Sequence, residues 1–291
     1  MTHFDPAFTV RSFVGAGGVR LSGAVGGVEG APVVVFLHGG GQTRRSWEGA
    51  ARAFAARGYC VINLDARGHG DSEWAPDGCY KVEVQAADLR AVLADITAPI
   101  ALVGASMGGI TALHLVGSGP PPAVTALVMV DIVPRIETLG AERIKSFMRA
   151  HRDGFATLDE AAQAVAAYSS HRQRPKDNSG LMANLRQRDD GRLYWHWDPR
   201  LIDGPQSIEP PDFSDDLLAL SRRITTPVML VRGLLSDVVS EQGIAEFRAV
   251  VPHLEVWEVP QAGHMVAGDR NDAFNQGVLS FLEQHMKVGK P

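Results

Sequence analysis

The stretch IALVGASMGGITALHL, residues 100–115, places one serine where an apolar strand must turn directly into a helix. Four apolar residues open the stretch, and apolar side chains recur at helical spacing from Met107 onward. Between these two patterns, Ser106 stands between Gly104 and Gly108. A buried strand gains nothing from a hydroxyl, whereas glycines allow the close backbone approach that a tight turn requires. We therefore expect Ser106 to lie on a strained strand-to-helix turn, as a nucleophile would.

The same alternation of apolar run and helical pattern continues through most of the chain. The expected buried strands are 32–40, 59–65, 100–106, 126–132, 227–233 and 254–260. The expected helices are 47–56, 82–95, 241–250, 273–285 and one that begins at Met107. Two shorter alternating runs, 9–14 and 19–25, predict an antiparallel pair at the N-terminus. This order predicts an α/β protein with a mostly parallel central sheet and helices on both faces.

Residues 134–225 interrupt this order and are expected to form an inserted helical cap over the ends of the strands. They contain helical stretches, including a capping box at Thr157 and Glu160, and loops rich in Pro, Asp and Arg. The core domain is then expected to consist of residues 1–133 and 226–291.

Polar and glycine residues gather after the expected strands. In a parallel sheet, functional groups collect beyond the carboxyl ends of the strands. The residues found at such ends are His38, Gly39, Gly40, Gly41, Asp65, Ser106, Asp131, Asp237 and His264. Their convergence predicts a single site at that edge of the sheet.

A serine at this place needs help from other side chains, because its hydroxyl is a poor nucleophile at neutral pH. It requires a base within hydrogen-bond reach, and the base requires an acid that orients it. A helix that begins directly after the serine also points its free N–H groups at developing negative charge.

With a strand before it and a helix after it, the Gly-x-Ser-x-Gly of residues 104–108 resembles the nucleophile elbow of the α/β-hydrolase superfamily. The order Ser…Asp…His along the chain is similar to the order in that family. The resemblance covers nearly everything outside the expected cap. It implies that Ser106 is the nucleophile and that His264, in the Ala-Gly-His of residues 262–264, is the base.

The resemblance leaves the orienting acid open between two residues. Asp237 follows the penultimate strand, where the family usually keeps its acid, and we expect it to fill this role. The usual spacing is Gly-x-x-Asp, however, and the step from Gly233 to Asp237 is one residue longer. Asp131 follows the preceding strand and is the alternative, since some members of the family use that position.

The glycine run after His38 resembles the family's oxyanion loop. The resemblance implies that the backbone N–H groups of Gly40 and Met107 stabilise the oxyanion, with Gly41 as an alternative donor. His38 is expected to hold the loop in place, and the turn 64–72 to support it. Arg44 and its neighbour Arg45 are expected to be solvated surface residues.

The cap offers the aromatic side chains Trp195 and Trp197, beside Tyr194 and His196. They are expected either to line a substrate pocket or to pin the cap to its base, and the sequence favours neither.

These residues predict a serine hydrolase that cleaves a small carboxylic ester or lactone through an acyl-serine intermediate, with no metal or organic cofactor. Perhydrolases that lack a cofactor and carbon–carbon bond hydrolases are alternatives, because they use the same triad. Epoxide hydrolases and haloalkane dehalogenases resemble each other in using an aspartate nucleophile, which Ser106 replaces here. A ligand-binding receptor without catalytic activity is the alternative from a different class.

Composition limits the expected partners of the 291-residue chain. A formal net charge of −5 gives no reason to expect nucleic acid or an anionic membrane surface. Two cysteines make no disulfide framework, and neither a signal peptide nor an apolar run of about 20 residues is visible. We expect a soluble cytoplasmic protein acting on a small molecule, and the sequence leaves its oligomeric state open.

Overall fold

An eight-stranded sheet forms the centre of the computed structural model, which describes residues 8–119, 123–168, 177–207 and 213–286. Its strands, in spatial order, are β1 (Phe8–Val14), β2 (Arg20–Gly27), β4 (Cys60–Leu64), β3 (Val33–Leu37), β5 (Ile100–Ala105), β6 (Val124–Val130), β9 (Val228–Gly233) and β10 (Leu254–Val259). β1 and β2 pair antiparallel, β2 is antiparallel to β4, and all other neighbours are parallel. The predicted N-terminal antiparallel pair and the mostly parallel sheet are both confirmed.

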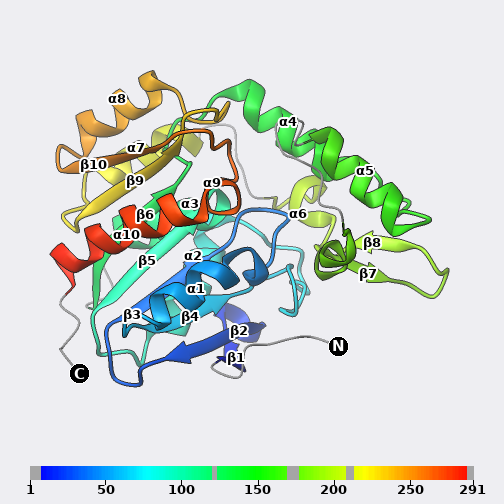
Figure 1. The fold of residues 1–291 in the computed structure, drawn as a ribbon, viewed down its shortest axis with the longest axis horizontal. Helices are drawn as coiled ribbons and strands as arrows, with labels where there is room; N and C mark the ends of the chain where they lie inside the picture. Colours follow the sequence, from blue (N-terminus) through cyan, green and yellow to red (C-terminus); the bar gives the residue numbers. More distant parts are fainter. Residues whose placement is uncertain (1–7, 120–122, 169–176, 208–212, 287–291) are drawn as a thin grey trace.

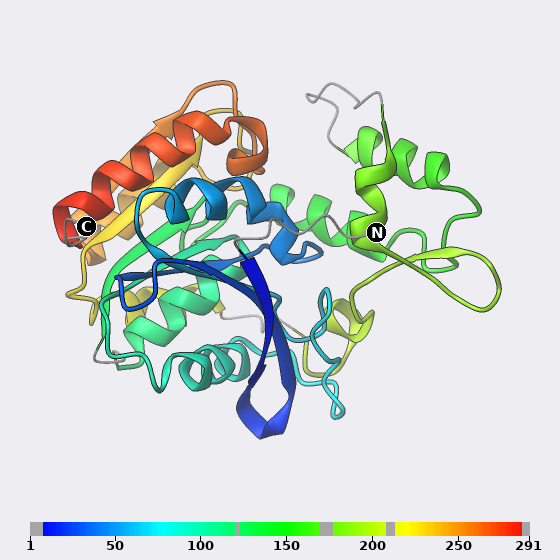
Figure 2. The same ribbon diagram turned by 60° about the horizontal axis from the view of Figure 1, so that its bottom comes forward.

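Helices cover both faces of this sheet, as predicted (Figure 2). One face carries α1 (Glu48–Ala55) and α10 (Asn271–His285), and the other carries α2 (Val82–Leu93), α3 (Met107–Gly117) and α8 (Glu241–Val250). Successive side chains of a strand point to opposite faces of the sheet. In β3, Val34 and Phe36 pack against α1 on one face, whereas Val33 and Val35 pack against α2 and α3 on the other. Because both faces are covered, the central strands are apolar throughout.

The expected cap lies beyond one end of the strands (Figure 1). It contains α4 (Thr138–Arg149), α5 (Leu158–Tyr168), a 3-10 helix η3 (Ser179–Asn184) and α6 (Arg200–Asp203). It also contains a hairpin of β7 (Leu185–Gln187) and β8 (Leu193–Trp195), which the sequence analysis missed. Phe155, Leu193 and Trp195 are buried in a separate apolar cluster that binds these pieces together.

The last helix of the stretch expected to be cap packs on the core instead. α7 (Phe213–Ser221) buries Leu217 in the same apolar cluster as α3 and α8, and Leu220 packs against Gly117 of α3. β6 and β9 are parallel neighbours, so the chain needs a crossover between them, usually a helix. α7 supplies that helix. No helix in the described part of the chain is long and apolar enough to cross a membrane.

Candidate active site

Ser106 occupies the turn between β5 and α3, with φ +47° and ψ −116°. This is the left-handed region that a residue with a side chain rarely adopts. The turn is held from both sides, because the Ser106 N–H donates to the Val130 carbonyl at 3.2 Å and the Ile110 N–H donates to the Ser106 carbonyl at 3.0 Å. The strained strand-to-helix turn predicted from the sequence is present.

The flanking glycines are required by close backbone approach. A Cβ on Gly104 would lie 2.4 Å from the Gly108 carbonyl oxygen, and a Cβ on Gly108 would lie 2.5 Å from the Leu37 carbonyl oxygen. Real Cβ atoms do not approach backbone this closely. Both glycines therefore let α3 start directly against β5 and the end of β3.

The side chain beside His264 is Asp131. The His264 Nδ1–H donates to Asp131 Oδ2 at 2.8 Å, and the Asp131 carboxylate is fully buried. Asp131 has φ +50° and also accepts hydrogen bonds from the Gly233 N–H at 2.9 Å and from the Ser236 hydroxyl. Because Nδ1 carries the hydrogen that is donated to Asp131 in this hydrogen bond, the other ring nitrogen, Nε2, is free to accept a proton.

The expectation that Asp237 orients His264 is wrong in this structure, and the alternative, Asp131, stands in its place. The Asp237 carboxylate is 41% exposed and pairs with Arg143 of α4 at 3.0 Å. The spacing gives the reason: in a Gly-x-x-Asp pattern counted from Gly233, the acid would stand at position 236, which is Ser236 here. The extra residue puts Ser236 against Asp131 and turns Asp237 toward the cap.

Ser106 and His264 both line a cavity of about 510 Å3 between the sheet and the cap. This volume lies in the range of about 300–1,000 Å3 that small-molecule sites occupy. Most of the lining is apolar, and it comes from α4, α5, the hairpin region and the loops after the strands. The residues brought together at its floor are Gly39, Gly40, Gly41, Gln42, Ser106, Met107, His264 and Met265.

Two backbone N–H groups are available at this floor. The Gly39 N–H donates to Gln42 Oε1 at 3.2 Å and the Gly41 N–H donates to His69 Nε2 at 3.1 Å. Gly40 N–H has no hydrogen-bond partner in the described part of the chain, and Met107 is the first residue of α3, whose N–H has no acceptor within the helix. Of the two glycines considered as donors, Gly40 is thus free and Gly41 is engaged.

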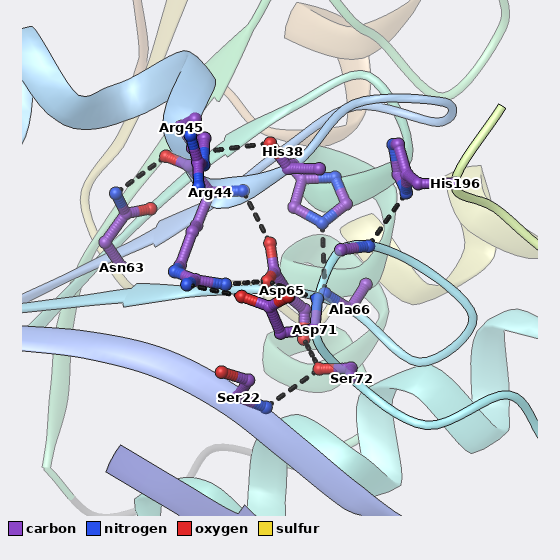
Figure 3. Close-up of polar contacts among 12 residues, drawn as sticks. Ser22, His38, Arg44, Arg45, Asn63, Asp65, Ala66, Asp71, Ser72 and His196 are labelled. Atoms are coloured by element: carbon purple, nitrogen blue, oxygen red, sulfur yellow. Dashed lines mark hydrogen bonds and ion pairs between the residues drawn. The ribbon is translucent and has the colours of Figure 1, made fainter. Parts of the chain in front are cut away.

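Three buried histidines tie the glycine loop and the cap to the turn 64–72, each by accepting a backbone N–H. His38 Nε2 accepts from Ala66 at 3.0 Å, His69 accepts from Gly41 as above, and His196 Nδ1 accepts from Gly70 at 2.8 Å. Figure 3 shows His38 bonded to Ala66 of this turn, with His196 on the same side of the turn in this view. His38 therefore holds the loop, as expected.

Burial keeps these histidines neutral. It lowers the pKa of His38, lowers that of His69 well below its usual value, and lowers that of His196 to about 3, with neighbouring histidines adding to the effect for His69 and His196. An accepting ring nitrogen must be unprotonated, so the low pKa values agree with the hydrogen bonds.

Arg44 is buried beneath the loop, which corrects the expectation of a solvated residue. Its guanidinium pairs with the fully buried Asp65 and with Asp71, and its N–H donates to Asp65 Oδ1 at 2.7 Å (Figure 3). The Asn63 amide donates to the Arg44 carbonyl at 2.7 Å. Nothing in the pair Arg44-Arg45 itself indicates that one arginine is buried. The only sign in the sequence is the presence of aspartates in the turn 64–72, which can pair with a buried arginine.

Trp195 and Trp197 lie between the cavity and the glycine loop. Their rings stack at 4.9 Å and 11°, both are buried, and both line the cavity. Trp197 also lies 3.3 Å from the place that a Cβ on Gly41 would occupy. The pair therefore forms a cavity wall and packs the cap against the glycine loop, while His196 ties the cap to Gly70 of the turn 64–72.

The comparisons agree with this geometry. The chain belongs to the alpha/beta hydrolase family, whose model matches residues 34–276. The matched segment runs from within β3 to the first turns of α10 and contains all the cavity-floor residues named above.

Several relatives are similar over most of their length. Esterase Rv0045c of Mycobacterium tuberculosis is 33% identical over 265 residues, which are 87% of this chain and 83% of the relative. The sn-1-specific diacylglycerol lipase ABHD11 of Mus musculus is 31% identical over 273 residues, 86% and 81% of the two chains. A crystal structure of esterase Rv0045c superposes with a TM-score of 0.75 and 29% identity, covering 96% of this chain and 93% of that one. The matches support an ester-cleaving enzyme of this class.

Proposed function

We propose that the protein is a serine esterase that cleaves a small carboxylic ester or lactone through an acyl-serine intermediate. The observation that carries the proposal is the hydrogen bond from His264 to the buried Asp131, at the floor of the cavity that Ser106 also lines. The family membership and the esterase and lipase relatives point to the same chemistry.

In the proposed mechanism, His264 Nε2 takes the Ser106 proton as the serine oxygen attacks the ester carbonyl. Asp131 keeps the ring in the tautomer that leaves Nε2 free and stabilises the imidazolium that forms. His264 then gives the proton to the departing alcohol. Water, activated by His264 in the same way, releases the acid from Ser106.

As the ester carbonyl is attacked, its oxygen becomes negatively charged. We assign the stabilisation of this charge to hydrogen bonds from the N–H groups of Gly40 and Met107. An oxyanion donor of this kind contributes about 3 kcal/mol when measured by its removal. The N-terminus of α3 adds a favourable dipole at the same place. His69, which accepts the Gly41 N–H, and His38, which accepts the Ala66 N–H, tie the glycine loop to the turn 64–72, so that Gly40 needs no rearrangement during the reaction.

The test is a panel of 4-nitrophenyl esters graded by acyl length, together with a fluorophosphonate probe. We expect hydrolysis that Ser106→Ala abolishes, and a single labelled peptide that contains Ser106. Removal of a nucleophile of this type costs a factor of about 10^6 in kcat. Ester hydrolysis that survives Ser106→Ala, or labelling at another residue, would overturn the assignment.

A further inference from the structure

The cavity-facing side of α4 departs from the pattern of an amphipathic helix. Ala141, Ile144 and Met148 of this helix line the cavity at the spacing of one helix face. Lys145 lies in the same stripe and lines the cavity too, although its neighbours there are apolar. A charged side chain among apolar neighbours costs free energy unless it has a partner or a function.

Arg149 lines the cavity one turn further along α4. Lys145 and Arg149 are four residues apart, so they lie on the same side of the helix, where two like charges disfavour the helix slightly. No Asp or Glu occurs among the described residues that line the cavity. The wall formed by α4 therefore brings two cations to an otherwise mostly apolar space.

Among the described residues, Lys145 and Arg149 each have an acidic partner that does not line the cavity. Glu142 is 3.4 Å from Lys145 on the helix, and Asp203 is 3.0 Å from Arg149. Glu142 is 54% exposed and Asp203 is shared with Arg152. Ion pairs this exposed contribute about 1 kcal/mol or less, so an anion inside the cavity can compete with them for the cations.

We propose that the substrate is an amphipathic ester with an anionic group, a carboxylate or a phosphate, which Lys145 and Arg149 bind while the apolar wall takes the rest of the molecule. This inference rests on the proposed esterase function and names the substrate class of that site.

The helix also sets the region of the cavity in which the anion binds. Met148 Sδ lies 3.8 Å from the place of a Cβ on Gly40, so this part of α4 overlies the oxyanion loop. Lys145 precedes Met148 by three residues, a rise of about 4.5 Å along the helix. We therefore expect the anionic group to bind a few bonds from the scissile carbonyl, within reach of the long lysine and arginine side chains.

The experiment compares two esters with the same six-carbon acyl chain: 4-nitrophenyl hexanoate, which is neutral, and mono-4-nitrophenyl adipate, which ends in a carboxylate. We expect the wild-type protein to prefer the adipate in kcat/KM, and this preference to shrink between about 0.1 M and about 1 M salt as the Debye length falls. Lys145→Gln and Arg149→Gln should each reduce the adipate-to-hexanoate ratio by about fivefold.

Arg152→Gln is the matched control, because Arg152 also pairs with Asp203 but does not line the cavity. Its adipate-to-hexanoate ratio should equal that of the wild type. A wild-type preference for the neutral ester, or a ratio that Lys145→Gln leaves unchanged, overturns the inference while the esterase function stands. Release of nitrophenol from neither ester instead contradicts the proposed function itself.

Inhibition of hexanoate-ester hydrolysis identifies the anion. Hexanoate and hexyl phosphate are compared with hexanol, which carries the same chain without charge. Stronger inhibition by hexanoate indicates a carboxylate substrate and stronger inhibition by hexyl phosphate indicates a phosphate, and Lys145→Gln should weaken either. Equal inhibition by all three compounds would contradict anion binding.

Discussion

At the scale of single residues, the sequence favoured Asp237 as the acid and left Asp131 as the alternative, because the carboxyl ends of parallel strands meet at one edge of a sheet. The structure separates them by side-chain direction. Asp131, at φ +50°, turns its carboxylate toward His264, whereas Asp237 turns toward Arg143 on the cap. A positive φ at a non-glycine residue leaves no mark in a single sequence. The extra residue between Gly233 and Asp237 was the only sign in the sequence against Asp237 as the acid. The structure explains it, because Ser236 occupies the expected position of the acid and donates to Asp131.

The buried histidine His196 leads to a prediction about how stability depends on pH. The folded protein holds the pKa of His196 at about 3, below the value of about 6.5 expected for the unfolded chain. The unfolded chain therefore binds a proton that the folded protein does not. The contribution of neutral His196 to the free energy of unfolding is therefore fully present above about pH 6.5 and is lost as the pH falls toward about 3.

We expect His196→Asn, whose amide oxygen can still accept the Gly70 N–H, to flatten this dependence. The free energy of unfolding should fall less steeply with pH than in the wild type, by about 1 kcal/mol per pH unit between about pH 6 and about pH 4. Urea unfolding at several pH values measures the slope. His253→Asn, at an exposed position, is the control; a wild-type slope in His196→Asn would contradict the buried neutral histidine.

At the scale of helices and strands, the core elements could be predicted closely. The strand expected at 227–233 is β9 at Val228–Gly233, and that expected at 254–260 is β10 at Leu254–Val259. Long apolar runs that are buried on both sides carry a strong signal. The three-residue strands β7 and β8 are too short to show a period, and α7 was assigned to the cap because its role as a crossover depends on the strand order.

The strand-to-helix turn gives a prediction about stability. Gly104→Ala places a Cβ 2.4 Å from the Gly108 carbonyl oxygen, and backbone on both sides has no room to retreat. We expect a loss of about 3 kcal/mol in the free energy of unfolding. Gly180→Ala in η3 is the control, since a Cβ there meets nothing within 4 Å and should change stability by less than about 0.5 kcal/mol. Equal stability of the two variants would show that the elbow does not need its glycine.

At the scale of the whole molecule, the cap is attached to the core in two different ways. On the hairpin side, His196 accepts the Gly70 N–H, the Asp198 N–H donates to the Gly68 carbonyl at 3.0 Å, and Tyr80 donates to Asp198 at 2.6 Å. These contacts are buried or half-buried. On the helix side, Arg143 of α4 pairs with Asp237 of the core. Within the cap, the same guanidinium lies 5.2 Å from the ring centre of Tyr168 in α5.

We therefore expect the helix side to open more easily than the hairpin side. We expect Arg143→Gln to speed hydrogen exchange in α4 and α5 by about fivefold, because a half-exposed ion pair and a cation–π contact contribute about 1 kcal/mol. Exchange in β7 and β8, followed by mass spectrometry in the same sample, should not change. Faster exchange in all four elements together would mean that the cap moves as one unit.

The proposed function requires one catalytic triad, made of Ser106, His264 and Asp131, to which Asp237 does not belong. The most direct test of this triad is kcat/KM for one nitrophenyl ester in Asp131→Asn and Asp237→Asn, with thermal unfolding to verify that both variants are folded. Asp131→Asn leaves His264 without the acceptor that sets its tautomer, so we expect activity to fall by about 10^3- to 10^4-fold. Asp237→Asn removes an exposed ion pair and should change activity by less than about fivefold. A folded Asp131→Asn variant that keeps wild-type activity, with Asp237→Asn inactive, would contradict the account.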